Sequence, residues 1–281
     1  MDRLSNITTF GIGGPAEVVY PGSVEELIRI SNRLRGEGVT FRVIGNGSNI
    51  LAADEGCGGV VIVTNKMTNE GRGLFESGAL LPRLAAWARD NGLMGLEWAA
   101  GIPATVGGAV FGNAGAYGNC MADIVRSVTV WKEGDIITYN TVECKFYYRD
   151  SIFKHEKAII LSVDLNLKQG DRVRIIETMN RYADKRRATQ PQERSAGSIF
   201  KKLGDTPAWQ LIDKAGLRGL QIGGAQISPK HANFIINKGG ATARDVLDII
   251  DRVTQKIQLE PEIIYLGEAF GSRRLPHTFC F

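Results

Sequence analysis

Apolar and polar positions alternate over the first 65 residues in a pattern that predicts strands around one helix. Apolar side chains follow Ser23 at helical spacing over residues 24–34, and glutamates occupy the first turn of that segment as in a capping box. Three short apolar runs, at residues 17–20, 41–44 and 59–63, are bounded by glycine, proline or polar residues, as strands are. The pattern therefore predicts a βαββ unit.

The middle of the chain predicts one helix and several antiparallel strands. Residues 81–91 have the helix pattern, with Pro82 in the favoured first turn and a glycine directly after the end. Strands are predicted at residues 127–131, 136–139 and 158–163. Their alternation of apolar and polar positions is typical of an antiparallel sheet with one face in solvent.

The last third of the chain predicts a small, separate α+β domain, joined to the rest by a strongly amphipathic helix over residues 171–187. Thr206, as the cap, and Pro207 are expected to begin the first helix of that domain. Its elements are predicted, in the order αββαβ, at residues 206–215, 220–227, 233–237, 242–257 and 262–266. The domain boundary is expected near residues 168–190.

Composition is that of a soluble globular chain of about two domains, at ~150 residues per domain. The chain has 281 residues, of which 43% are hydrophobic and 23% charged. Its 34 glycines exceed the usual share of ~7% and gather in clusters, which indicates backbone-shaped sites. The N-terminus has no apolar segment and no stretch predicts a membrane span, so we expect a cytoplasmic protein without membrane insertion.

Charge and cysteine spacing exclude several classes of function. A net charge of +4, from 34 basic and 30 acidic residues, is too even for a dedicated nucleic-acid binder but compatible with an anionic small-molecule substrate. The four cysteines lie far apart without a C-x-x-C pair, and the three histidines are scattered. We therefore expect no disulfide framework and no metal site.

Two glycine-rich segments are candidates for ligand binding. Gly45–Asn49 directly follows a predicted strand, where successive backbone N–H groups can hold a pyrophosphate, although Ile50 replaces the third glycine of the dinucleotide fingerprint. Residues 101–118 carry mostly small side chains, which let a backbone or a flat ligand approach closely. The alternatives are a structural turn at the first segment and helix–sheet packing at the second. Taken together, the two segments are about equally compatible with a dinucleotide cofactor and with a purely structural role.

Several polar residues are candidates for the chemistry. Arg149 offers a fork for a carboxylate or phosphate, or forms a simple surface turn with Asp150. Ser198 lies among small residues outside any G-x-S-x-G elbow, so it is either a proton donor or part of a capped turn. His231 is either a site residue or a loop cap, and the basic residues within 181–194 form a solvated face or steer an anion. These residues alone predict a two-domain protein that binds a nucleotide.

Seven segments of the chain resemble, in the same order, the UDP-N-acetylenolpyruvoylglucosamine reductase family. They lie at residues 8–14, 45–49, 101–118, 148–154, 196–201, 222–234 and 260–262. The resemblance implies an α+β fold, in which a two-subdomain FAD-binding fold of the PCMH type precedes a small α+β substrate-binding domain. The implied subdomains are residues 1–65 and 66–170, followed by the substrate-binding domain at 171–270 and a tail at 271–281.

The same resemblance implies a reaction in two halves. NADPH reduces FAD and NADP⁺ leaves, after which the reduced flavin delivers hydride to UDP-N-acetylglucosamine enolpyruvate. The product is UDP-N-acetylmuramate, a precursor of peptidoglycan. A cytoplasmic monomer without a nucleic-acid partner is expected.

Residues that match the family's motifs take the roles of that reaction. Arg149 would stabilise the substrate carboxylate, Ser198 would protonate the carbanion, and Glu262 would polarise the carboxylate in its own protonated form. The implied FAD-binding residues are Gly45, Asn46, Gly47, Ser48, Asn49, Gly101, Ile102, Pro103, Thr105, Gly108, Asn113 and Gly115. The implied substrate contacts are Tyr148, Lys201, Gln226, His231 and Asn233.

The chain departs from the longer relatives at three places. Arg149 and Ser198 are only 49 positions apart, too few for an inserted substrate loop, so the chain resembles the short class of the family. Lys202 and Leu203 follow the serine motif where many relatives have Asn-Pro, and the N-terminal helix common in relatives is expected to be missing.

Two other functions are compatible with a flavin-type fold. An FAD-dependent oxidase of the wider fold often tethers its flavin through a histidine, and neither glycine-rich segment contains one. A nucleotide-sugar binder without flavin chemistry would not need Arg149, Ser198 and Glu262 together. Both alternatives are therefore less favoured than the reductase.

Overall fold

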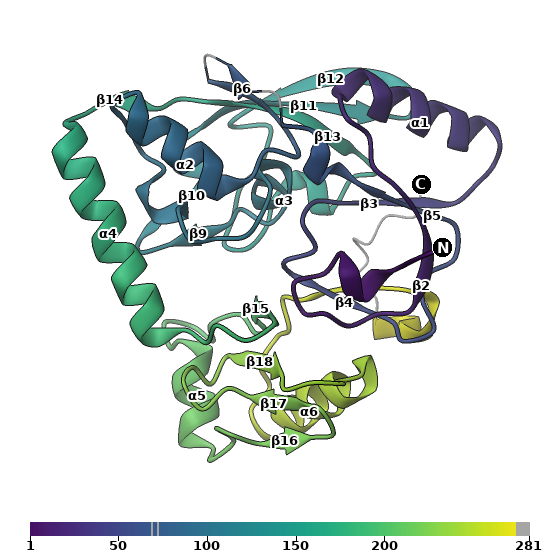
Figure 1. Cartoon of the computed structure of the whole chain (residues 1–281), viewed down its shortest axis with the longest axis vertical. Coiled ribbons are helices and arrows are strands. Elements are labelled where there is room, and N and C mark those ends of the chain that lie inside the picture. Colours follow the sequence, from purple (N-terminus) through teal and green to yellow (C-terminus); the bar gives the residue numbers. More distant parts are fainter. Residues whose placement is uncertain (69, 72, 274–281) are drawn as a thin grey trace. The chain divides into compact units, whose positions relative to one another are not determined.

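The computed structural model describes residues 1–68, 70–71 and 73–273, and it divides into two compact units (Figure 1). The central unit contains residues 18–46 and 59–186. The C-terminal unit contains residues 1–17, 47–58 and the described residues from Arg187 onward. The change of unit at Arg187 falls inside the boundary expected near residues 168–190, whereas the two N-terminal segments of the C-terminal unit were not predicted.

An antiparallel sheet forms the framework of the central unit, as the alternating strands predicted. Its strand order is β12-β11-β13-β7-β6. The strands are β12 (Asp135–Asn140), β11 (Val125–Lys132), β13 (Ile159–Leu165), β7 (Leu74–Glu76) and β6 (Glu70–Gly71). Strand β12 is largely exposed while β13 is largely buried, so one part of the sheet faces solvent and the other carries the core.

Two helices pack on the core of this sheet. Helix α2 (Leu81–Asp90) begins with Pro82 in its first turn, as predicted. Helix α3 (Val106–Phe111) was predicted only as the helix–sheet packing alternative for the second glycine-rich segment, because its two adjacent glycines disfavour a helix by ~1 kcal/mol each. A Cβ on Gly107 would lie 2.7 Å from the Ser77 Cβ, so only glycine allows α3 to approach so closely. Tertiary packing thus outweighs propensity here.

A second core of the central unit lies under helix α1 (Val24–Gly36). The Ser23 side chain accepts a hydrogen bond from the Glu26 N–H at 3.2 Å, but Glu26 bonds the Gly22 N–H, so only half of the predicted capping box forms. Strands β3 (Phe41–Ile44) and β5 (Val60–Val63) pair in parallel, and the connection between them, residues 45–59, contains a short strand and no helix. Leu27, Phe41, Ile62 and Trp131 are buried in this core.

The C-terminal unit is a small α+β body, as predicted. Its sheet has the order β15-β18-β17-β16, and Figure 1 shows helix α6 lying along it. The elements are β15 (Ser195–Ser198), α5 (Ala208–Lys214), β16 (Gln221–Ile222), β17 (Ala225–Ile227), β18 (Phe234–Asn237) and α6 (Ala243–Lys256). Phe10 and Leu51, from the two N-terminal segments, complete its core.

Three sequence-based expectations for these elements were wrong. The strand predicted at residues 220–227 is a hairpin that turns at Gly223, where φ is +51°. Helix α5 has Pro207 as its N-cap and no side-chain cap from Thr206. Strand β4 (Ile50–Ala52) was missed and pairs in parallel with β19 (Ile264–Leu266).

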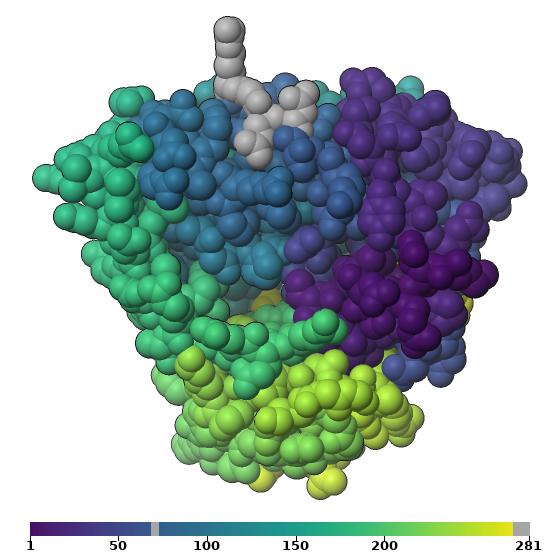
Figure 2. Space-filling model, viewed as in Figure 1, coloured from purple at the N-terminus to yellow at the C-terminus, as the bar shows by residue number. Residues whose placement is uncertain are grey.

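Helix α4 (Arg172–Thr189) was predicted to be strongly amphipathic, and this was wrong. Among its residues only Ile175 is buried, and Figure 2 shows its side chains standing at the surface. Met179 and Tyr182 pack at the margin of the central core. The helix is stabilised by residues of high intrinsic helix propensity and by a few contacts, instead of by a buried apolar stripe.

The remaining elements are short. Strands are β1 (Asp2–Arg3), β2 (Pro15–Val19), β8 (Leu93–Met94), β9 (Gly115–Ala116), β10 (Asn119–Cys120) and β14 (Lys168–Gln169). The 3₁₀ helices are η1 (Leu4–Asn6), η2 (Thr64–Lys66), η3 (Glu97–Ala99), η4 (Met121–Asp123), η5 (Ile152–Lys154) and η6 (Glu268–Arg273). The predicted tail starts within η6, and residues 274–281 lie outside the described part of the chain.

Two kinds of functional feature are absent from the described residues. These residues contain no helix with both the length and the apolar character needed to cross a bilayer. They also contain no group of three or more histidine, cysteine, aspartate or glutamate side chains arranged to hold a metal ion.

Candidate active site

The loop Gly45–Asn49 presents a row of backbone amides. None of its five N–H groups donates a hydrogen bond to another described residue. Gly47 has a φ of +61°, and a Cβ there would lie 2.3 Å from the Ile7 carbonyl oxygen, so the loop requires glycine at this position. Successive N–H donors without acceptors form the kind of concavity that binds phosphate oxygens.

The two glycine-rich segments meet in the central unit. The Asn46 side chain donates a hydrogen bond to the Pro103 carbonyl at 2.9 Å. A Cβ on Gly45 would lie 2.3 Å from Thr105 Oγ1, which itself accepts a hydrogen bond from the Gly108 N–H at 3.2 Å. Five residues predicted to bind the cofactor are thus brought together by close backbone approach, which glycine alone permits.

The end of the second glycine-rich segment lies against the turn that carries Arg149. Asn113 adopts a φ of +42°; its amide donates to the Tyr147 carbonyl at 2.8 Å and accepts from the Ala122 N–H at 3.0 Å. The Gly115 carbonyl accepts a hydrogen bond from Arg149 Nη2 at 3.2 Å. Asn113 and Gly115 therefore fix the arginine turn, which the sequence did not indicate.

Arg149 stands at the tip of a tight turn. The Tyr147 N–H donates to the Asp150 carbonyl and the Asp150 N–H donates back to the Tyr147 carbonyl, at 3.0 and 3.2 Å. Arg149 has a φ of +57°, and its guanidinium lies 5.4 Å from the centre of the Tyr148 ring. The turn holds both side chains at the surface of the central unit.

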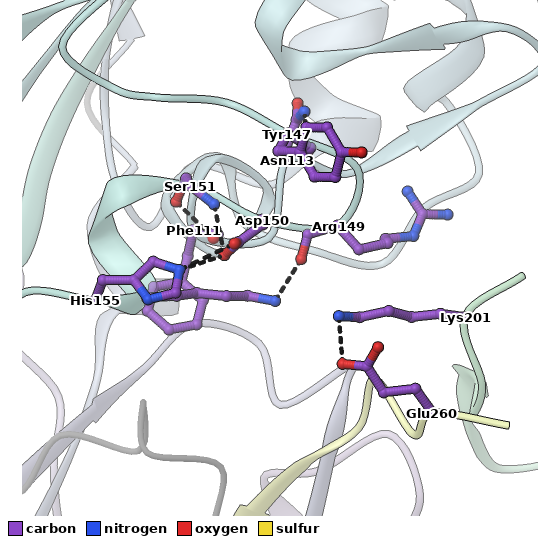
Figure 3. A network of polar contacts seen from close by, with 10 residues as sticks. Phe111, Asn113, Tyr147, Arg149, Asp150, Ser151, His155, Lys201 and Glu260 are labelled. Atoms are coloured by element: carbon purple, nitrogen blue, oxygen red, sulfur yellow. Dashed lines mark hydrogen bonds and ion pairs between the residues drawn. The ribbon is translucent and has the colours of Figure 1, made fainter. Parts of the chain in front are cut away.

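The Asp150 carboxylate is directed toward other partners than Arg149. It accepts hydrogen bonds from His155 Nε2 at 2.9 Å and from the Ser151 N–H at 3.0 Å. Burial raises the pKa of Asp150, but these bonds and the His155 charge outweigh burial and hold it below its usual value. Figure 3 shows the Arg149 guanidinium extending away from this carboxylate, although both residues lie in the surface turn that the sequence offered as the alternative.

Ser198 ends strand β15 in the C-terminal unit, directly after Gly197 at a φ of +75°. The residues that follow are held on both sides. The Asn233 backbone carbonyl accepts from the Ile199 N–H, and its side-chain amide accepts from the Phe200 N–H and donates to the Phe200 carbonyl. Asn233 therefore positions the serine segment, and it was predicted as a substrate contact.

The segment that carries Glu262 pairs with the serine segment. The Glu262 N–H donates to the Ile199 carbonyl at 2.8 Å, and the Lys201 N–H donates to the Glu260 carbonyl at 2.9 Å. The Glu262 residue is only 9% exposed, and the Asn49 side chain donates to its carbonyl at 3.0 Å. Ser198 and Glu262 are thus placed by neighbouring backbone segments of one unit.

Three further predicted contacts lie in the same unit. Lys201 Nζ forms an ion pair with Glu260 Oε1 at 2.6 Å, which Figure 3 shows. The Gln226 side chain donates to the Gly219 carbonyl at 3.2 Å. His231 Nδ1 is buried and, within the described residues, has no hydrogen-bond partner. Burial and the Arg218 charge lower the pKa of His231, so its imidazole is neutral at neutral pH.

The central unit contains a cation–aromatic cluster that the sequence analysis did not predict as a group. The Tyr117 and Tyr182 rings stack at 4.2 Å, with Lys185 and Arg186 over Tyr117. A Cβ on Gly101 would lie 2.7 Å from Arg186 Nε, so this cluster also fixes the start of the second glycine-rich segment. The signal was present, because Tyr182 and Arg186 are four residues apart and share a helix face.

Comparisons with known proteins agree with this arrangement. A family model described as FAD binding domain matches residues 15–139, and one described as UDP-N-acetylenolpyruvoylglucosamine reductase, C-terminal domain, matches residues 190–266. The reductase of Carboxydothermus hydrogenoformans is 44% identical over 95% of this chain and 93% of its own length. That of Bacillus subtilis is 43% identical over 93% of this chain and 89% of its own.

A solved structure is similar over nearly the whole chain. The structure of UDP-N-acetylenolpyruvylglucosamine reductase (MurB) from Thermus caldophilus superposes with a TM-score of 0.86 at 40% identity, covering 94% of this chain and 97% of that one. Its likeness confirms the α+β fold class. With both family models in order and relatives matched along their length, the chain belongs to the UDP-N-acetylenolpyruvoylglucosamine reductase family.

Proposed function

We propose that this chain converts UDP-N-acetylglucosamine enolpyruvate to UDP-N-acetylmuramate, a step of peptidoglycan precursor synthesis. NADPH is the reductant and FAD the cofactor, as in the family to which the chain belongs. The observation that carries the proposal is the row of backbone amides in Gly45–Asn49 that donate to no described residue, in a chain that also has Arg149, Ser198 and Glu262 at the family's motifs. When bound, FAD would supply hydride-transfer chemistry between NADPH and the enolpyruvyl double bond.

The residues of the glycine-rich segments fit a dinucleotide such as FAD. The acceptor-free amides of Gly45–Asn49 match the diphosphate oxygens, which need several donors. Close contact of Gly45 with Thr105 and of Asn46 with Pro103 keeps side chains out of the path of the ligand. The other predicted residues, Ile102, Asn113 and Gly115 among them, line or support the same segment.

Arg149 stabilises the charge that develops on the substrate. Hydride arrival at the double bond leaves an electron pair shared between the α-carbon and its carboxylate. A guanidinium fork binds that carboxylate more strongly as charge accumulates, which lowers the barrier. The turn supports this role because it presents the guanidinium away from Asp150.

Ser198 and Glu262 act on the same enolate-like species. The Ser198 hydroxyl donates the proton that completes addition across the double bond, and such general-acid catalysis contributes roughly 10²–10⁴-fold. Glu262, which is buried, would donate a hydrogen bond to the carboxylate when its own carboxyl is protonated. Proximity of their backbone segments supports a shared target.

The remaining predicted residues bind or orient the nucleotide sugar. Lys201 supplies positive charge for the diphosphate, and Tyr148 and Gln226 offer polar contacts. The unpaired Nδ1 of the neutral His231 accepts a hydrogen bond from a sugar hydroxyl. Asn233 acts by holding the Ser198 segment. The division at residues 1–65, 66–170 and 171–270, the monomeric state and the cytoplasmic location stay predictions.

An absorption spectrum of the purified protein tests the function directly. A yellow protein that bleaches with anaerobic NADPH and recolours with UDP-N-acetylglucosamine enolpyruvate supports both halves of the reaction. Recolouring only in air would favour an oxidase instead. A colourless protein that takes up no added FAD would contradict the flavin function and leave a nucleotide-sugar binder.

A further inference from the structure

Lys154 is a buried lysine directed at the backbone of Arg149. The residue is 9% exposed, and its ammonium donates a hydrogen bond to the Arg149 carbonyl at 2.6 Å. The ammonium also lies 5.9 Å from the centre of the Phe111 ring. Burying an ammonium costs several kcal/mol unless its protons are bonded, so this contact has a structural consequence.

The Arg149 backbone needs such support. A φ of +57° places this residue in the left-handed region, which is strained for any residue that carries a side chain. Strained conformations of this kind persist only where neighbouring groups determine them. The Lys154 bond holds the Arg149 carbonyl, while the Tyr147–Asp150 pair closes the turn around it.

Lys154 is itself fixed to helix α3. It ends the short helix η5, which begins after Ser151, and Ser151 Oγ donates to the Phe111 carbonyl at 2.8 Å (Figure 3). Asn113, directly after α3, holds the Tyr147 carbonyl on the other side of the turn. The end of α3 thus fixes both sides of the arginine turn.

The Lys154 charge also bears on Asp150. Burial raises the pKa of Asp150, and the Lys154 charge, after the His155 and Ser151 interactions, helps to hold that pKa below its usual value. That carboxylate is directed at His155 and at the Ser151 N–H, so it does not compete for the guanidinium. Asp150 and Lys154, the acidic and basic neighbours of Arg149, therefore both bind groups of the turn and leave the guanidinium to other contacts.

We propose that Lys154 is a positioning residue for Arg149: its buried ammonium holds the arginine backbone in the left-handed conformation that presents the guanidinium to the substrate carboxylate. Lys154 touches neither substrate nor cofactor in this role. The proposal rests on the proposed function of Arg149 and adds a residue that acts through it.

The test compares Lys154→Met with a matched control elsewhere in the chain. Lys256 Nζ likewise donates to a backbone carbonyl, that of Ala215, at 2.6 Å. Lys256→Met therefore removes the same kind of bond far from the arginine turn in the sequence. The FAD-loaded proteins are compared by stopped-flow in each half-reaction and by calorimetric binding of UDP-N-acetylmuramate to the oxidised protein.

We expect Lys154→Met to slow flavin reoxidation by the enolpyruvyl substrate by about tenfold or more and to weaken product binding by a similar factor. Flavin reduction by NADPH and flavin content stay within about twofold of wild type, and Lys256→Met leaves all four quantities unchanged. Lys154→Arg, which keeps a charged donor, retains more reoxidation rate than Lys154→Met. Equal loss in both half-reactions would overturn the proposal.

A double-mutant cycle separates positioning from an independent role. In an Arg149→Ala background, Lys154→Met should cause little further loss, because its effect passes through the arginine. Multiplicative losses would show that Lys154 acts independently and would overturn the proposal. Normal reoxidation in Arg149→Ala alone would instead contradict the proposed function of Arg149, so the two failures are distinguishable.

A folding defect in Lys154→Met does not remove the test. Ser151→Ala keeps the ammonium but deletes the hydroxyl that ties η5 to the Phe111 carbonyl. It should reproduce the selective loss in reoxidation and product binding with a smaller magnitude. Wild-type values for both quantities in Ser151→Ala would overturn the proposal.

Discussion

In the proposed mechanism, individual side chains of this protein act in separate steps of the reaction. Ser198 and Glu262 are held by backbone pairing in the C-terminal unit, and Arg149 by a strained turn in the central unit. Each of these positions depends on a few hydrogen bonds to backbone atoms, with asparagines at 113 and 233 supplying several of them. Substitution of a single polar group is therefore expected to affect one half-reaction.

Replacing Ser198 by alanine should impair only the second half-reaction. Flavin reduction by NADPH stays near wild type, while reoxidation by the enolpyruvyl substrate slows by roughly 10²–10⁴-fold, because the proton donor is lost. Stopped-flow absorbance measures both. Ser195→Ala, in the same strand, is the control and should change neither rate; an equal loss in both half-reactions for Ser198→Ala would remove the serine from its role.

Replacing Arg149 by lysine keeps the charge and removes the fork. An ammonium cannot bind a carboxylate in two places, so we expect reoxidation to slow by about 10²-fold with NADPH reduction preserved. Arg126→Lys, at an arginine paired with Asp164 on the sheet, should leave both rates intact. Normal turnover of the Arg149 variant would contradict the assignment.

At the scale of elements, left-handed backbone conformations occur in loops and at helix ends. Gly47 and Gly38 both have a φ above +60°, but a Cβ on Gly47 meets Ile7 and Thr8, whereas one on Gly38 meets nothing within 4 Å. Both alanine variants bear a left-handed strain of about 1 kcal/mol. Only Gly47→Ala should lose FAD, measured as flavin absorbance per protein; equal flavin content in the two variants would refute the amide-cradle assignment.

The start of helix α6 predicts a dependence of stability on pH. Burial raises the pKa of Asp245, but the N–H groups of Thr242 and Gly224, at 3.0 and 3.1 Å from its carboxylate, outweigh burial and lower it. A lowered pKa stabilises the fold above the ordinary carboxyl pKa, and this stabilisation disappears as pH falls through the lowered value.

Asp245→Asn should therefore destabilise the protein at pH 7 by about 1 kcal/mol and by less in acid. Thermal unfolding at pH 7 and at a pH well below the ordinary carboxyl pKa measures the difference. Asp248→Asn, which removes the exposed partner of Arg244, is the control and should cost less. If the loss of stability in Asp245→Asn became larger in acid, the carboxylate would not be what stabilises the helix start.

At the scale of the whole molecule, the C-terminal unit is assembled from distant parts of the chain. The Gly14 N–H bonds the Ala53 carbonyl, the Asn237 side chain bonds the Phe10 carbonyl, and β4 pairs in parallel with β19. The three-residue strand β4 has no local signal of its own, since its pairing partner lies more than 200 residues away. Contiguous domain boundaries drawn along the sequence therefore missed this interleaving.

The sequence by itself determined the features that depend on neighbouring residues. Hydrophobic periodicity located α1, α2, α6 and the main strands, proline marked the start of α2, and the order of glycine and polar motifs identified the family. These follow from local propensity and spacing, which a linear pattern records directly.

Only the tertiary structure decided which groups meet and which polar atoms are already engaged. It formed α3 from adjacent glycines, directed Asp150 to His155, placed Lys154 under the Arg149 turn and committed the Asn233 amide to Phe200. Each of these outcomes depends on close packing or on hydrogen bonds between residues whose proximity the fold creates. Local propensity does not contain that information, because the free energy comes from contacts made only after folding.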